Sequence, residues 1–165
     1  MMKVQFMMMA LLLMALASCG PTPKEAGAYN DKLMAQQKAV VLKYDKMLET
    51  FDTYVPAKMD AALLSLMEQL DVSKNIVRDI EPVAGGEALK EEVLRYISVF
   101  EDAASDDFDY LIRLYKVPEN EFTAEVRIQW DSRYKEVDTK LKDAAAHLKA
   151  VQQAFAENFN LTIIK

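Results

Sequence analysis

Apolar residues recur every three or four positions along most of this chain, which places them on one face of an α-helix. The first helix is predicted to begin at Asn30, a residue type that caps helices. Its apolar face consists of Leu33, Val40, Tyr44, Met47, Phe51 and Tyr54. A second helix is predicted from Pro56, and it ends before Pro82. Its apolar face consists of Met59, Leu63, Leu66, Leu70, Val77 and Ile80.

Two further helices are predicted in the second half of the chain. The third runs from Glu87 to about Val117 and carries apolar residues at Leu89, Val93, Ile97, Phe100, Ala104, Phe108, Leu111 and Tyr115. The fourth begins within residues 118–121 and reaches about Phe159. A helix of that size is on the order of 60 Å long. Short turns marked by proline or glycine make neighbouring helices antiparallel. The sequence therefore predicts an all-α fold, an elongated antiparallel up-down-up-down four-helix bundle with a long C-terminal helix.

The N-terminal segment, up to Ala28, does not follow this pattern. Lys3 precedes a stretch of apolar residues, Val4–Ala17, which is interrupted only by Gln5 and is shorter than a transmembrane helix requires. Such a stretch is typical of a cleaved signal peptide, here residues 1–18. Residues 20–28 contain Pro21, Pro23 and Gly27 and few apolar side chains, so we expect an extended tether. The remaining residues, 29–165, are predicted to form the bundle domain.

The segment Leu16-Ala17-Ser18-Cys19 resembles the lipobox of bacterial lipoproteins. In that family the cysteine thiol is joined to diacylglycerol, the signal is cut before the cysteine, and the new amino terminus is usually acylated too. The resemblance implies cleavage after Leu16-Ala17-Ser18 and lipid attachment at Cys19, which holds the only thiol of the chain. Two or more acyl chains anchor a protein stably, so the membrane is an expected partner. An ordinary secretory signal followed by a chance cysteine is the alternative.

Lipoproteins that carry Asp directly after the cysteine are often kept at the inner membrane. Gly20 stands there in this chain, so the resemblance implies an outer-membrane location, at either the periplasmic face or the cell surface. The bundle layout and the segment Ala28-Tyr29-Asn30-Asp31 also resemble uncharacterised helical surface lipoproteins of Gram-negative bacteria. No site residues follow from this second resemblance.

Net charge narrows the class of partner. The chain carries a formal charge of −6, and removal of residues 1–18 takes away Lys3 and no acid, which makes it −7. Nucleic acid is not an expected partner, because phosphate binding needs a basic patch and the sequence shows none. The leading interpretation is a structural or protein-interaction module that presents an acidic surface to a protein partner.

Residue patterns for catalysis or metal binding are missing from the sequence. The only thiol is assigned to lipid, and no Glu-x-x-His pair of a di-metal bundle occurs. Five acidic residues in the third helix have helical spacing, unlike a calcium-binding loop, so we expect a solvated face: Glu101, Asp102, Asp106, Asp107 and Asp109. The sequence thus predicts neither an enzyme nor a metal site, and no cofactor.

A ligand inside the bundle is the alternative function. Gln37 falls near the middle of the first apolar face, where a buried amide needs hydrogen-bond partners. Together with Tyr44, Trp130 and Tyr134 it is a candidate for lining a pocket for a small hydrophobic ligand. Haem is a further alternative, held between Met34 or Met47 and the single histidine, His147.

Overall fold

The computed structural model describes residues 20–53 and 55–162. The predicted signal peptide, its cleavage site and Cys19 lie outside the described residues. So do residues 54 and 163–165.

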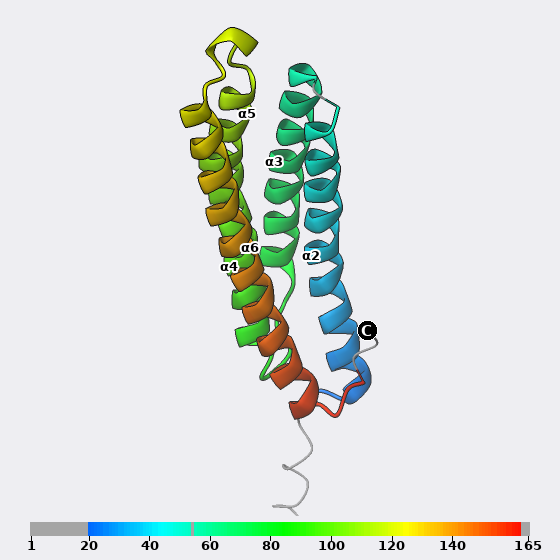
Figure 1. Ribbon diagram of the computed structural model, residues 1–165. Helices are drawn as coiled ribbons and strands as arrows, with labels where there is room; N and C mark the ends of the chain where they lie inside the picture. The colour runs from blue at the N-terminus through cyan, green and yellow to red at the C-terminus, as the bar shows by residue number, and fades with distance from the viewer. Residues whose placement is uncertain (1–19, 54, 163–165) are drawn as a thin grey trace, which may run out of the picture.

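The described chain forms four antiparallel helical rods that lie side by side in an elongated bundle (Figure 1). With the labels of Figure 1, the first two rods are α2 (Pro23–Phe51) and α3 (Pro56–Asp79). The third rod consists of α4 (Glu87–Asp102), a π-helical segment (Ala103–Phe108) and α5 (Asp109–Tyr115). A 3₁₀ turn (Glu119–Glu121) precedes the last rod, α6 (Ala124–Asn158). The predicted all-α, up-down-up-down architecture with a long C-terminal helix is confirmed.

The first helix begins earlier than the sequence predicts. It starts at Pro23 rather than at Asn30, so most of the expected tether is helical. The Thr22 hydroxyl accepts a hydrogen bond from the Glu25 amide, and the Glu25 carboxylate accepts one from the Thr22 amide, at 3.3 and 2.8 Å. This reciprocal capping box satisfies two amide groups that the first turn leaves without partners. Pro23 favours the same start, because its fixed φ suits the first helical position.

The last helix begins later than predicted. Thr123 caps α6 by accepting a hydrogen bond from the Val126 amide, and residues 119–121 form the separate 3₁₀ turn. As a result α6 is somewhat shorter than the predicted last helix, although it is still the longest helix in the described part of the chain. No helix among the described residues is long and apolar enough to cross a membrane.

The rods pair as two hairpins. α2 packs mainly on α3, and α6 packs mainly on α4, while α3 and α4 join the two halves. α2 and α6 lie further apart along most of their length. They meet near the bundle ends, through Tyr29 and Phe155 at one end and Phe51 and Trp130 at the other, with ring centroids 5.8 and 6.1 Å apart. The apolar faces predicted from sequence fill the interior, where residues such as Leu33 are fully buried.

The end of the bundle where α2 begins also receives the described residues that follow α6, up to residue 162 (Figure 1). Leu161 is partly buried against the core, and its side chain lies close to Gly27. The Tyr29 hydroxyl donates a 2.8 Å hydrogen bond to the carbonyl of Gly86, in the turn that joins α3 to α4. The start of α2 is therefore packed against both the α3–α4 turn and the residues after α6.

Candidate functional site

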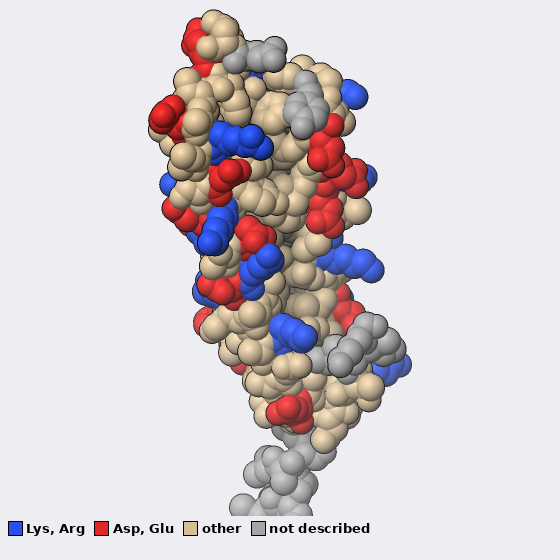
Figure 2. Space-filling model, viewed as in Figure 1, with Lys and Arg blue, Asp and Glu red and all other residues tan. Residues whose placement is uncertain are grey.

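A cleft of about 670 Å³ opens between α2 and α6 at the end of the bundle opposite the start of α2. We call it the distal cleft, and it is lined by Asp45, Leu48, Glu49, Phe51, Asp52, Trp130 and Tyr134. It exists because α2 and α6 are not closely packed, so side chains on their facing edges are covered on one side only. In Figure 2 an uncharged, hollowed strip separates the two helices there, and acidic side chains gather over the upper part of α2.

Three aromatic rings form the apolar walls of the distal cleft. The rings of Trp130 and Tyr134 stack nearly parallel, with centroids 5.1 Å apart and planes at 7°. Phe51 meets Trp130 from α2 at 6.1 Å and 72°. The indole N–H of Trp130 is buried and has no hydrogen-bond partner among the described residues. All three rings are half-buried, so each still exposes surface to the cleft.

The other two predicted ligand residues do not line this cleft. Tyr44 packs in the core against Phe100 and Phe108, with ring centroids 5.4 and 5.7 Å away. Burial and, secondarily, the neighbouring Tyr134 raise the pKa of Tyr44 far above its usual value. Gln37 is half-buried, and its side chain hydrogen-bonds the buried Tyr96. The structure therefore brings Trp130 and Tyr134 together in a cleft, while Gln37 and Tyr44 are half-buried and contact core residues instead.

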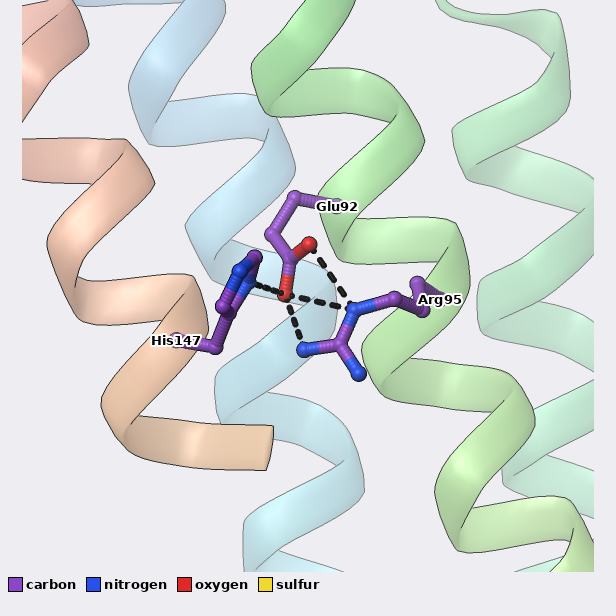
Figure 3. A network of polar contacts seen from close by, with 3 residues as sticks. All are labelled: Glu92, Arg95 and His147. Carbon is purple, nitrogen blue, oxygen red and sulfur yellow. Dashed lines mark hydrogen bonds and ion pairs between the residues drawn. The ribbon is translucent and has the colours of Figure 1, made fainter. Parts of the chain in front are cut away.

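His147, in α6, contacts a carboxylate of α4. Its Nδ1 lies 2.8 Å from Oε1 of Glu92, and Arg95 Nε contacts both carboxylate oxygens of Glu92 at 3.0 and 2.9 Å (Figure 3). The Glu92 side chain is only 7% exposed. Burial raises the pKa of Glu92, but the hydrogen bonds from Arg95 and His147 outweigh it and hold that pKa below its ordinary value. Figure 3 shows the carboxylate between a cation of its own helix and the imidazole of α6.

Met34 and Met47, the other half of the haem alternative, belong to α2. Met47 is fully buried and Met34 is half-buried against the core. The side chain of His147 is 61% exposed, and the cleft that it helps to line contains neither methionine. Within residues 20–53 and 55–162, no cluster of three His, Cys, Asp or Glu side chains is arranged to hold a metal ion.

The prediction of a solvated acidic face is wrong for Asp107. This carboxylate is 11% exposed and lies 2.6 Å from Arg133 Nε and 3.8 Å from Lys140 Nζ, both on α6. The cause is the π-helical segment, whose wider turn rotates Asp107 toward α6. Asp102 and Asp106 remain exposed, as predicted.

A second cleft, of similar volume, lies beside the π-helical segment. Its lining mixes both charges, including Asp106, Arg113, Arg133 and Glu136. Arg113 pairs with Asp109 at 3.0 Å, and Arg133 pairs with Asp107. Because these cations are already paired, this cleft offers no uniform charge to a ligand, and the distal cleft is the better candidate.

Comparison with known proteins identifies no relative of this chain. No family model matches the chain, and neither a curated protein nor a solved structure shows significant similarity to it.

Proposed function

We propose that this chain is a lipid-anchored envelope protein of the bacterial lipoprotein type, whose helical bundle acts as a structural or protein-interaction module. The observation that carries the proposal is the lipobox-like segment ending at Cys19. Under this proposal the membrane is the partner of the lipid on Cys19, and the outer membrane is the location, as Gly20 favours. We assign no reaction to the chain.

The start of α2 supports a firm attachment. Only Gly20, Pro21 and Thr22 separate Cys19 from the first helical residue, Pro23. A segment this short spans at most about 11 Å even when fully extended. A lipid on Cys19 would therefore hold the bundle end close to the membrane surface, with the long axis leading away from it.

Exposed apolar side chains support the interaction role. α3 exposes Leu64, Met67, Val72 and Ile76 by between 41% and 59%. Leu64 and Met67 are three residues apart and Val72 and Ile76 are four, so the members of each pair adjoin on the helix surface. Exposed apolar side chains that adjoin one another are typical of surfaces that bind other proteins. α3 is therefore the helix at which crosslinking should test for a protein partner.

The anchor is tested by metabolic labelling with a fatty acid in cells that make the wild type or Cys19→Ala. We expect label in the wild type and none in the variant. Lys24→Ala is the control, because it lies outside the lipobox-like segment at an exposed position and leaves the thiol intact. Equal labelling of the wild type and Cys19→Ala would contradict the proposal.

Location is tested by protease treatment of intact cells, with a periplasmic protein as the lysis control. Degradation of the bundle while the control survives would place it at the cell surface. Survival until the outer membrane is opened would place it at the periplasmic face.

A further inference from the structure

We propose that the distal cleft binds a small organic ammonium ion with an apolar body. This inference goes beyond the proposed function, and only its choice of a dissolved ligand over a lipid headgroup rests on the proposed lipid anchor. It rests on the combination of three aromatic rings and three carboxylates in one open cleft of about 670 Å³.

The aromatic walls suit a cation that carries methyl or methylene groups. The face of an aromatic ring attracts a cation, and tryptophan does so most strongly. Phe51 meets Trp130 at 72° and Tyr134 stacks on Trp130, and the exposed parts of these half-buried rings line the cleft in two orientations. A bulky ammonium group can therefore contact two differently oriented aromatic surfaces at once. A neutral apolar molecule of the same shape gains only the apolar contact.

The carboxylates supply the matching charge. Asp45, Glu49 and Asp52 follow one another at four- and three-residue steps, so they lie along one edge of α2. All three are exposed, and none of the ion pairs in the described part of the chain uses them. Among the described residues that line the cleft there is no Lys or Arg. The local charge is thus negative and available to a cation.

A bare metal ion does not fit the same site. Divalent cations need several oxygen ligands close together, and the described residues form no such group. Aromatic walls also offer little to a hydrated ion, whereas they remove the methyl groups of an organic cation from water. The chemistry therefore favours an organic cation.

The location of the cleft favours a free ligand over a lipid headgroup. It lies at the last turns of α2, a helix of 29 residues that starts at Pro23. A helix of that length extends over roughly 40 Å. The start of α2 lies at the other end of the bundle. A headgroup in a membrane at that end would not reach the cleft, while a dissolved ammonium compound would.

Binding can be followed by the fluorescence of Trp130, the only tryptophan of the chain. Choline and phenyltrimethylammonium are titrated into the purified full chain, and 3,3-dimethylbutan-1-ol serves as the uncharged analogue of choline. We expect saturable changes with the two cations and about tenfold weaker binding of the alcohol. Added salt should weaken the binding of the cations, because exposed charges are screened.

Charge variants then test the site itself. The double variant Asp45→Asn with Glu49→Gln should weaken choline binding about threefold to tenfold. The matched control is Glu68→Gln with Asp71→Asn, which removes the same charge from exposed positions of α3 and should leave choline binding unchanged. Three results would each overturn the proposal: no saturable change with either cation, equal binding of choline and the alcohol, or equal affinities of the two double variants.

Discussion

The imidazole of His147 in α6 lies 2.8 Å from the carboxylate of Glu92 in α4. This contact joins residues that are far apart in the sequence and secures α6 to the helix on which it mainly packs. Arg95 holds the same carboxylate from the next turn of α4, with Nη2 at 2.5 Å from Oε1. The buried charge is therefore paired within its own helix and across the interface.

Removal of the charge of Glu92 should weaken this interface. Glu92→Gln keeps the side-chain size but takes the charged partner from both Arg95 and His147. We expect a loss of about 1–3 kcal/mol in the free energy of unfolding, measured by urea denaturation. Glu91→Gln, at the exposed neighbouring position, should have little effect. Equal losses in the two variants would show that Glu92 contributes no more than a surface carboxylate.

The lowered pKa of Glu92 predicts a specific dependence of stability on pH. The unfolded chain takes up a proton near the ordinary pKa of 4.5, while the folded chain does so only at lower pH. The stabilisation from Glu92 is thus fully present above the unfolded pKa and is lost as the pH falls through the folded pKa. Denaturation of the wild type and Glu92→Gln at a series of pH values should show their stabilities converging on acidification. A constant difference down to about pH 3 would contradict this assignment.

Arg133 should stabilise the π-helical segment through Asp107. Arg133→Met leaves the carboxylate of Asp107 largely buried, with only Lys140 at 3.8 Å. Because Arg133 itself is 39% exposed, the loss of stability should be smaller than that on breaking a fully buried ion pair. We expect a loss of about 2 kcal/mol in the free energy of unfolding. Thermal unfolding measures it, with Arg127→Met as the control at an exposed position of the same helix. Asp107→Asn in the Arg133→Met background should recover part of the loss.

Gly86 is required where the α3–α4 turn contacts α2. A Cβ at this position would lie 2.8 Å from Tyr29 Cε1 and 2.9 Å from Val83 Cγ2. Gly86→Ala should therefore displace the Tyr29 ring from its hydrogen bond and cost about 1–3 kcal/mol. Gly20→Ala is the control, since nothing lies within 4 Å of a Cβ there. Chemical denaturation measures the stability of both variants. Equal stabilities would contradict this packing.

The capping box predicts a local effect at the start of α2. The Glu25 amide loses its acceptor in Thr22→Ala. This substitution should lower the free energy of unfolding by about 1 kcal/mol. Hydrogen exchange of the amides in the first turn should become faster, while exchange in the middle of α2 stays the same. Thr162→Ala is an exposed control at the same end of the bundle. Unchanged exchange near Glu25 would argue against the cap.

Two features of the sequence predict the bundle. Helical spacing gives the apolar faces of four helices, and the proline- or glycine-marked turns between them specify antiparallel packing. The start of α2 differs from the prediction for a physical reason. Pro21 and Pro23 are typical of loops, but Thr22-Pro23-Lys24-Glu25 also has the spacing of a capping box and a proline at the first helical position. The cap outweighs the loop preference, and the helix begins there.

The candidate sites are predictable only in part. Trp130 and Tyr134 are four residues apart on one helix, so their proximity follows from spacing. The contact between Glu92 and His147 does not follow from spacing. His147 is distant in sequence, and the contact depends on how α4 and α6 are rotated. Asp107 is buried through a π-helical turn, and the apolar pattern of the third helix gives no sign of that turn. The distal cleft likewise depends on the separation of α2 from α6, a tertiary property.

The separation of α2 from α6 also has a consequence for the order of folding. Contacts within each hairpin are local, such as the pair Lys43 and Ser65, which are 22 residues apart. The hydrogen bond from Gln152 to Asn30 spans 122 residues and needs both hairpins to have formed, since a long loop is costly to close in a disordered chain. Local contacts favour rapid folding, so the hairpins are expected to form first and the α2–α6 edge to close last. The two walls of the distal cleft would then come together only in the final step, and changes at Asn30 or Gln152 should speed unfolding without slowing folding.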